Sequence, residues 1–361
     1  MKINRQQFIE TLLKVKPGLS NSEIIEQSSN FIFDNKVVRT FNDEIAITHQ
    51  FETGLVGVVP AREFYALFNK ISDEEIDSTM ENEKFIFKGK GKRITFNINP
   101  EIKIQNIEAA GPRSKVWMPL PKNFSDCIKC CSFSVSKNIT SLELTCISVC
   151  GENTISCDSV RATSMLMDSE VEQEFLLPSA AAQVIGNYNP SRFYTDENWI
   201  HFINKENTTF SCRKIDREYP IEAIKNVFDV KGKTISLPSE LKDTLERSKI
   251  LVSNDLDEKE VKLTFKKGKL ICQSDGIVGQ IIEEIKLDYK GADLIITVNP
   301  KLLIEILERV TTAIVGDNKM LFKDESGFKH IIQLIENEEE TAKEKAPKKE
   351  SKVKRTKKKA K

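Results

Sequence analysis

The stretch VVPAREFYALFNKI, residues 58–71, has the pattern of an amphipathic helix that begins at a proline. Proline is favoured in the first turn of a helix, where its missing N–H group is not needed. Two stretches built in the same way follow along the chain: LLPSAAAQVIGNY (176–188) and TVNPKLLIEILERV (297–310). Because their prolines are 118 and 122 residues apart, the sequence predicts one structural unit that occurs three times.

Each stretch predicts a helix that lies on a core and is followed by a β-hairpin. Apolar residues recur at i, i+3, i+4 and i+7, which is the spacing of one helix face. They are Phe64, Leu67, Phe68 and Ile71; Ala181, Val184, Ile185 and Tyr188; and Leu303, Ile306, Leu307 and Val310. The runs that follow alternate apolar and polar residues around a turn containing Gly, Asn or Asp. These runs are KFIFKGKGKRITF (84–96), NWIHFINKENTTFSC (198–212) and KMLFKDESGFKHIIQL (319–334).

A second type of helix precedes each of these units, at spacings of 116 and 117 residues. Its apolar positions are Phe8, Thr11, Leu12 and Val15; Phe124, Cys127, Ile128 and Cys131; and, more loosely, Leu241, Thr244, Leu245 and Ser248. Strand-like runs lie between the two helices. We therefore expect three α+β domains, each in the order helix, strands, helix, strands, over residues 1–113, 114–232 and 233–337.

Composition indicates a cytoplasmic protein with an acidic body and a basic end. The chain has 39% hydrophobic residues, no apolar run of about 18 residues that would span a membrane, and no apolar stretch typical of a signal peptide near its start. Its eight cysteines are then expected to be reduced thiols. Residues 341–361 hold 11 of the 54 basic side chains and two of the 54 acidic ones. We expect residues 338–361 to be a disordered tail, either simply solvated or attracted to nucleic-acid phosphate.

Three short segments carry a resemblance to a known family. They are ISCDSVRA (155–162), CRKIDREYP (212–220) and YKGADLIITVNPKLLIEIL (289–307). With the order and spacing of the three units, they make the chain resemble the bacterial β sliding clamp, the processivity factor of DNA polymerase III. The resemblance covers the three expected domains and is diverged in sequence. It does not decide between a bacterial and a bacteriophage origin.

The resemblance implies a head-to-tail homodimeric ring with sheets outside and helices lining a hole for duplex DNA. Such a ring has no catalytic role and no cofactor. Its helices need basic side chains that contact phosphate without reading bases. The candidate DNA-binding residues are Lys14, Arg62, Lys70, Lys122, Lys129, Arg247, Lys301 and Arg309. The same helix faces also carry Glu10, Asp126, Asp243 and Glu305, so a mixed solvated face is the alternative.

Family members bind short linear peptides of polymerases and the clamp loader in an apolar pocket between the second and third domains. The counterparts here are Leu144, Cys157, Ser159, Val160, Ala162, Pro220, Ile224, Ile331 and Gln333. Cys157, Ser159 and Val160 stand where the family usually has Thr, Gly and His, and Gln333 stands where Met is usual. This departure predicts a different peptide preference. Ordinary core packing is the alternative for each apolar residue.

The ring seam of the family joins the first domain of one subunit to the third domain of the other. The resemblance places Ile104, Ile250 and Leu251 at this seam. An exposed apolar residue at an edge suits a subunit contact. Burial in the core of the same subunit is the alternative.

Other patterns indicate different classes of protein more weakly. Cys127, Cys130, Cys146 and Cys150 have a spacing that would suit zinc, but Cys127 falls on an apolar helix face. The glycines of KGKGKR (88–93) suit a hairpin turn better than a phosphate loop, because no helix follows to present N–H groups. A clamp-like ring that recruits transcription or repair proteins is the second hypothesis, and a nucleic-acid enzyme or zinc protein is the third.

Overall fold

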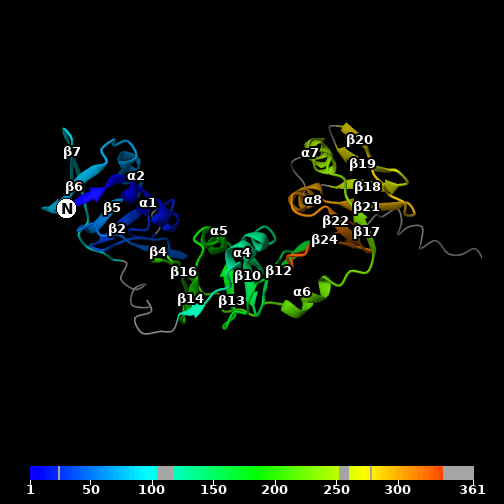
Figure 1. Ribbon diagram of the computed structural model, residues 1–361, viewed down its shortest axis with the longest axis horizontal. Coiled ribbons are helices and arrows are strands. Elements are labelled where there is room, and N and C mark those ends of the chain that lie inside the picture. The colour runs from blue at the N-terminus through cyan, green and yellow to red at the C-terminus, as the bar shows by residue number, and fades with distance from the viewer. Residues whose placement is uncertain (23–24, 104–116, 252–259, 277–278, 336–361) are drawn as a thin grey trace, which may run out of the picture. The chain divides into compact units, whose positions relative to one another are not determined.

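The computed structural model describes residues 1–22, 25–103, 117–251, 260–276 and 279–335. Along this part of the chain, one order of elements occurs three times: a strand, a helix, four strands, a helix and three strands (Figure 1). The prediction of three repeated α+β units is therefore confirmed. In each repeat the two helices pack against each other, and the first of them also packs on the second and third of the four strands.

The first repeat begins at the N-terminus. Its elements are β1 Lys2–Asn4, α1 Arg5–Val15, β2 Asn30–Asp34, β3 Val37–Phe41, β4 Ile45–Gln50, β5 Val56–Pro60, α2 Ala61–Phe68, β6 Glu75–Glu81, β7 Lys84–Gly89 and β8 Lys92–Asn97, with a short 3₁₀ helix η1 Lys16–Gly18. Helix α1 begins where the Asn4 side chain accepts a hydrogen bond from the Gln7 N–H. Its buried face consists of the predicted Phe8, Thr11, Leu12 and Val15.

The second repeat uses the same order. Its elements are β9 Met118–Pro119, α4 Phe124–Ser132, η2 Leu142–Thr145, β10 Cys146–Cys150, β11 Asn153–Cys157, β12 Arg161–Leu166, β13 Phe175–Pro178, α5 Ser179–Ile185, β14 Arg192–Thr195, β15 Trp199–Ile203 and β16 Thr208–Arg213. A connecting helix, α6 Ile221–Val227, follows. The predicted face of α4, including Cys127 and Cys131, is buried.

The third repeat completes the described chain. Its elements are β17 Lys233–Ser236, α7 Leu241–Leu251, β18 Val261–Lys266, β19 Lys269–Gly276, β20 Gly279–Lys286, β21 Leu294–Val298, α8 Pro300–Leu307, β22 Thr312–Val315, β23 Lys319–Lys323 and β24 Lys329–Gln333. Helix α8 starts at a proline, as predicted, and the Asn299 side chain caps it by accepting from the Lys301 N–H.

The chain divides into two compact units. Unit 1 comprises Met1–Asp229 with Lys323–His330, and unit 2 comprises Val230–Phe322 with the chain from Ile331 onward. The expected domain limits 1–113, 114–232 and 233–337 stay predictions, and the first limit and the basic tail lie outside the described residues. No helix in the described ranges is long and apolar enough to cross a membrane.

Within unit 1, one sheet joins the first two repeats, in the order β5-β2-β3-β4-β16-β15-β14-β9. The join is the antiparallel pair β4–β16, with Ile45 opposite Cys212 and His49 opposite Thr208. The other strands of unit 1 are ordered β1-β6-β7-β8 and β13-β10-β11-β12. In unit 2 the orders are β20-β19-β18-β21 and β17-β22-β23-β24. Strand β8 of unit 1 and strand β20 of unit 2 each lie at a sheet edge.

Candidate functional sites

The eight predicted DNA-binding residues lie on helices or directly beside them. Lys14, Arg62, Lys129, Arg247 and Lys301 belong to α1, α2, α4, α7 and α8. Lys70 and Arg309 follow α2 and α8 by two residues. The placement of Lys122 in a helix was wrong: a turn closed by the Phe124 N–H on the Pro121 carbonyl precedes α4 and contains Lys122. Their role in binding DNA stays a prediction.

Among these cations, Lys14 and Arg247 are engaged in ion pairs. Lys14 Nζ lies 2.6 Å from Glu206 Oε2, on the turn between β15 and β16. Arg247 holds Glu283 of β20 through two contacts, of 2.8 and 2.6 Å. Hydrogen bonding to Arg247 lowers the pKa of the Glu283 carboxyl. Both cations are therefore partly neutralised, which weakens their attraction for phosphate.

Lys129 of α4 is positioned by a glycine on the neighbouring helix. Its stem crosses Gly186, at the end of α5, where an added Cβ would lie 3.1 Å from Lys129 Cγ. A side chain at position 186 would press against this lysine. The ammonium group, in contrast, has no ion pair within the described residues and is exposed.

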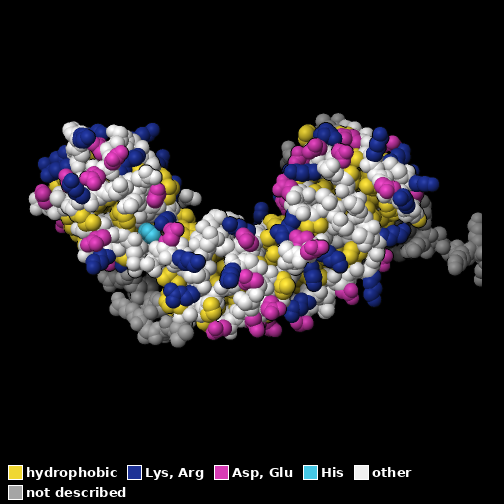
Figure 2. All heavy atoms as spheres, viewed as in Figure 1, with side chains coloured by type: hydrophobic (Ala, Val, Ile, Leu, Met, Phe, Trp, Pro, Cys, Tyr) yellow, Lys and Arg dark blue, Asp and Glu magenta, His cyan; other side chains and the backbone are white. Residues whose placement is uncertain are grey.

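Basic and acidic side chains are interspersed on the face of the molecule shown in Figure 2. Residues 1–340, which leave out the basic end, carry 43 basic and 52 acidic side chains. Any attraction for DNA therefore depends on local groups of lysines, because the field of the whole protein does not supply it.

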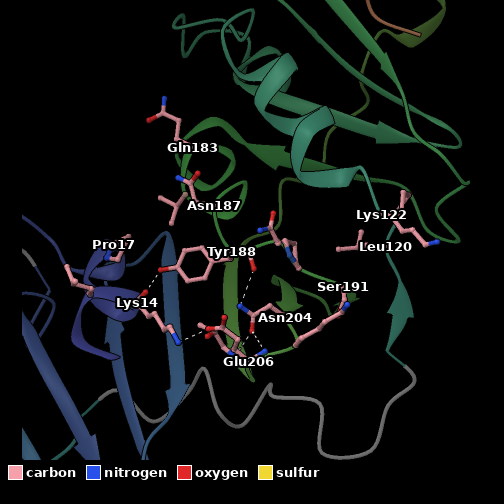
Figure 3. A pocket seen from close by; sticks show the side chains of 17 residues that line it. Lys14, Pro17, Leu120, Lys122, Gln183, Asn187, Tyr188, Ser191, Asn204 and Glu206 are labelled. Atoms are coloured by element: carbon pink, nitrogen blue, oxygen red, sulfur yellow. Dashed lines mark hydrogen bonds and ion pairs between the residues drawn. The ribbon is translucent and has the colours of Figure 1, made fainter. Parts of the chain in front are cut away.

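One such group lies at the joint between the first two repeats, in unit 1. Lys14 and Lys122 line a hollow of about 830 Å³ together with Lys205, which the sequence analysis missed. In Figure 3, Lys14 lies on one side of this hollow and Lys122 on the other. Lys205 lies on the β15–β16 turn, and the periodicity that marks helix faces in the sequence does not extend to this turn.

Ser159 and Val160 of the predicted peptide pocket lie in a tight turn at the surface of unit 1. Between β11 and β12, Asp158 Oδ1 accepts from the N–H groups of Val160 and Arg161, both at 2.9 Å. Arg161 Nε donates to Asp158 Oδ2 at the same distance. The turn therefore presents Ser159 and Val160, and the Val160 side chain is 42% exposed.

Behind this turn the predicted pocket residues become part of the core. Cys157 and Ala162 are opposite each other in β11 and β12 and are buried. The Tyr219 hydroxyl donates to Cys157 Sγ at 3.7 Å, and burial raises the pKa of both groups. Pro220 is exposed just before α6, whereas Ile224 in α6 is buried.

The remaining predicted pocket residues are divided between the two units. Leu144 in η2 is half-buried and belongs to unit 1. Ile331 and Gln333 of β24 belong to unit 2, where Ile331 is buried and Gln333 is exposed. The pocket as a whole therefore stays a prediction.

A buried polar network near these residues was not anticipated from the sequence. Thr163 of β12 links Ser134 and His330, at 2.5 and 2.8 Å. The ring of Phe133 lies 5.1 Å from His330, and Arg161 lies over the same ring. Burial, with the nearby Arg161 charge, lowers the pKa of His330 to about 3. A lone histidine in a strand-like run carries no sequence signal for such a contact.

Of the three predicted seam residues, the structure describes only the side chain of Ile250. Ile250, near the end of α7, is 78% exposed, as a subunit contact requires. Ile104 and the Leu251 side chain lie outside the described residues. The seam stays a prediction.

Six of the eight cysteines are buried, and Cys130 and Cys150 are partly exposed. Cys127 Sγ contacts the Leu166 carbonyl, and Cys131 Sγ contacts Thr154. Burial raises the pKa of Cys127 to about 12 and that of Cys146 to about 11. Across the described ranges, no group of three or more His, Cys, Asp or Glu residues could hold a metal ion. The KGKGKR segment forms the β7–β8 hairpin, as predicted.

A family model matches part of the chain. Residues 230–329 match the family model described as "DNA polymerase III beta subunit, C-terminal domain". No curated protein sequence matches the chain.

Solved structures match almost the whole chain. The DNA polymerase III beta chain of Streptococcus pneumoniae is 19% identical, with a TM-score of 0.79, and the match covers 93% of this chain and 99% of that one. The beta subunit of Thermotoga maritima is 15% identical, with the same TM-score and coverage. A sliding clamp of Bartonella birtlesii bound to griselimycin is 16% identical, with a TM-score of 0.81 and the same coverage. The chain therefore has the fold of the bacterial DNA polymerase III beta subunits, as the sequence predicted.

Proposed function

We propose that this chain, with the fold of the bacterial DNA polymerase III beta subunits, is a sliding clamp. It would encircle duplex DNA and tether a replicative polymerase as a non-catalytic processivity factor. The observation that carries the proposal is the threefold order of elements, matched over 93% of the chain by clamp structures. The family match of residues 230–329 supports it independently.

The repeat itself supports closure into a ring by a second copy of the chain. Strand β4 of the first repeat pairs with β16, the last strand of the second. The third repeat's counterpart of β4 is β20, and the first repeat's counterpart of β16 is β8. Both are edge strands, with hydrogen-bonding groups available on one side. If β20 of each subunit paired with β8 of the other, as β4 pairs with β16, two such contacts would close a head-to-tail dimer.

The seam is tested by two charge substitutions. Ile250 lies beside β20 and is 78% exposed, and Ile282 lies on β20 and is 55% exposed. Ile250→Asp and Ile282→Asp would each place a carboxylate at one of these positions. Sedimentation of the unchanged chain is expected to show a particle near twice 41.1 kDa, and each variant is expected to shift it towards one chain mass. Ile139→Asp is the matched control, because Ile139 is 83% exposed and belongs to neither edge strand. A variant that stays dimeric would place the seam elsewhere.

The function is tested by retention on DNA. The protein is loaded on nicked circular DNA with ATP and the clamp loader of its host, and free protein is removed by gel filtration. We expect the protein to remain on circles and to be released when a restriction enzyme linearises them. Equal loss from both forms would contradict the proposal.

A second candidate function is a clamp-like ring that recruits transcription or repair proteins. The observation that favours it is the turn at Ser159 and Val160, which departs from the family in the predicted peptide pocket, with Val160 42% exposed. Stimulation of the host's replicative polymerase on primed circular DNA separates the two functions. A protein that is retained on circles without lengthening the products would favour the second.

A further inference from the structure

The hollow at the joint between the first two repeats has a preformed wall. The Tyr188 hydroxyl donates to the Lys14 carbonyl at the end of α1. Asn204 Nδ2 donates to the Tyr188 carbonyl at 3.1 Å, and Asn204 Oδ1 accepts from the N–H groups of Glu206 and Thr208, both at 3.0 Å. In Figure 3, Tyr188 points towards Lys14, and Asn204 lies next to Glu206. A pocket held open by its own hydrogen bonds loses little entropy when a ligand enters.

The hollow has a net positive charge, and two of its charged side chains form no ion pair with a described residue. Of its four charged side chains, Lys14 and Glu206 neutralise each other. Lys122 and Lys205 are exposed and form no ion pair with any described residue. These two ammonium groups are available for an anionic ligand.

Polar amides accompany the lysines. Gln183, Asn187 and Asn189 line the hollow, are exposed, and make no side-chain hydrogen bond within the described ranges. A side-chain amide offers both a donor and an acceptor, which is the combination that base edges require. Groups of this kind are not needed for a bare phosphate ion.

The hollow also has apolar surface for flat groups. Leu13 is 46% exposed there, although it belongs to an amphipathic helix. The Tyr188 ring, Val184 and Pro17 continue this surface. Single-stranded nucleic acid is bound by just such a combination, because its bases pack on aromatic or apolar groups while lysines contact its phosphates.

We propose that this hollow, lined by Lys122, Lys205 and the amides of Gln183 and Asn187, binds a short segment of single-stranded DNA. An acidic peptide would use the lysines and the apolar surface but would leave the amides without a specific role. The proposal rests on the sliding-clamp function only for biological context. The hollow lies within unit 1, so it does not depend on the ring seam.

The test is the binding of a fluorescent deoxythymidine decamer to the full chain, followed by anisotropy over a range of salt concentrations. Lys122→Ala with Lys205→Ala is expected to weaken binding at least tenfold. It is also expected to reduce the slope of log affinity against log salt by about 1.4, because two contacts to single-stranded phosphate are lost. Lys36→Ala with Lys231→Ala removes the same charge from exposed positions outside the hollow and is expected to change neither quantity.

Three outcomes would overturn the proposal. The first is an equal loss of binding in the control variant, which would mean that charge alone attracts the strand. The second is full competition by an oligoglutamate peptide together with unchanged decamer binding in Gln183→Ala with Asn187→Ala, which would assign the hollow to an acidic peptide. Retention on circular DNA is measured in the same variants. If the chain is retained but does not bind the decamer, the hollow proposal fails while the clamp proposal stands.

Discussion

The first two repeats share an order of elements but fill their cores with different chemistry. In the first repeat, Phe8 lies within 6.5 Å of five other phenylalanine rings, those of Phe33, Phe51, Phe64, Phe68 and Phe87. Its counterpart Phe124 has two such neighbours, Phe175 and Phe202. Thiols and hydroxyls surround the rest of α4, where Cys131 contacts Thr154 and Ser156 donates to the Cys131 carbonyl.

This difference shows that the repeat determines where the core positions lie but not which side chains occupy them. Aromatic packing contributes through buried area and edge-to-face contacts. A hydroxyl network contributes less area, and it is costly when one member loses its partner. The two repeats should therefore respond to different substitutions.

The largest effect is expected from truncating an aromatic side chain in the first repeat. Phe64→Ala removes a ring that is fully buried among six others and should lower the free energy of unfolding by about 3–5 kcal/mol. Denaturant unfolding followed by circular dichroism measures it. Phe124→Ala in the second repeat should cost less, since Phe124 has fewer aromatic neighbours. An equal cost would remove the distinction between the two cores.

The next effect concerns the hydroxyl network of the second repeat. Thr163→Val keeps the shape but removes the hydroxyl that contacts Ser134 and His330, so the free energy of unfolding should fall by about 1–3 kcal/mol. The same denaturant experiment applies. Thr163→Ser, which keeps the hydroxyl, should recover a substantial part of the loss. If valine is tolerated as well as serine, packing and not hydrogen bonding stabilises this core.

A smaller, pH-dependent effect is expected from His330 in the same network. Its pKa is about 3 in the folded protein and near 6.5 when unfolded, so the unfolded chain binds the proton more readily. The stabilisation is complete above pH 6.5 and is lost as the pH falls towards 3. Between pH 6.5 and 5 the loss should be on the order of 1–2 kcal/mol. His330→Gln should flatten the pH dependence in denaturant titrations, and an unchanged slope would exclude this histidine as its source.

The smallest effect is expected at the surface joint between the repeats. Glu206→Gln removes the charge that pairs with Lys14, and exposed ion pairs contribute at most about 1 kcal/mol to stability. The same substitution frees Lys14 and should raise decamer affinity in the anisotropy assay. Glu197→Gln, an exposed acidic residue outside the hollow, is the control. Weaker decamer binding in Glu206→Gln would show that this carboxylate positions Lys14.

Much of the fold was predictable because periodic apolar residues mark helix faces and strands locally. Every residue predicted for the buried faces of α1 and α4 is buried, and Ser125 of α4 is buried with them. Lys122 was misplaced because a proline-led turn, Pro121 to Phe124, looks like the first turn of a helix in sequence. Among the pocket residues, the sequence could name Cys157 and Val160, but only the strand pairing shows that one is buried and the other exposed.

By itself, the sequence determined the threefold order of elements, because spacing and periodicity are properties of the chain alone. It also determined which helix faces are apolar. The tertiary structure decided which charges remain available, since Arg247 is held by Glu283 from a strand 36 residues away, whereas Lys205 has no ion pair among the described residues. It also decided that Lys14, Lys122 and Lys205 line one hollow, because the β4–β16 pairing brings together segments that are far apart in the chain.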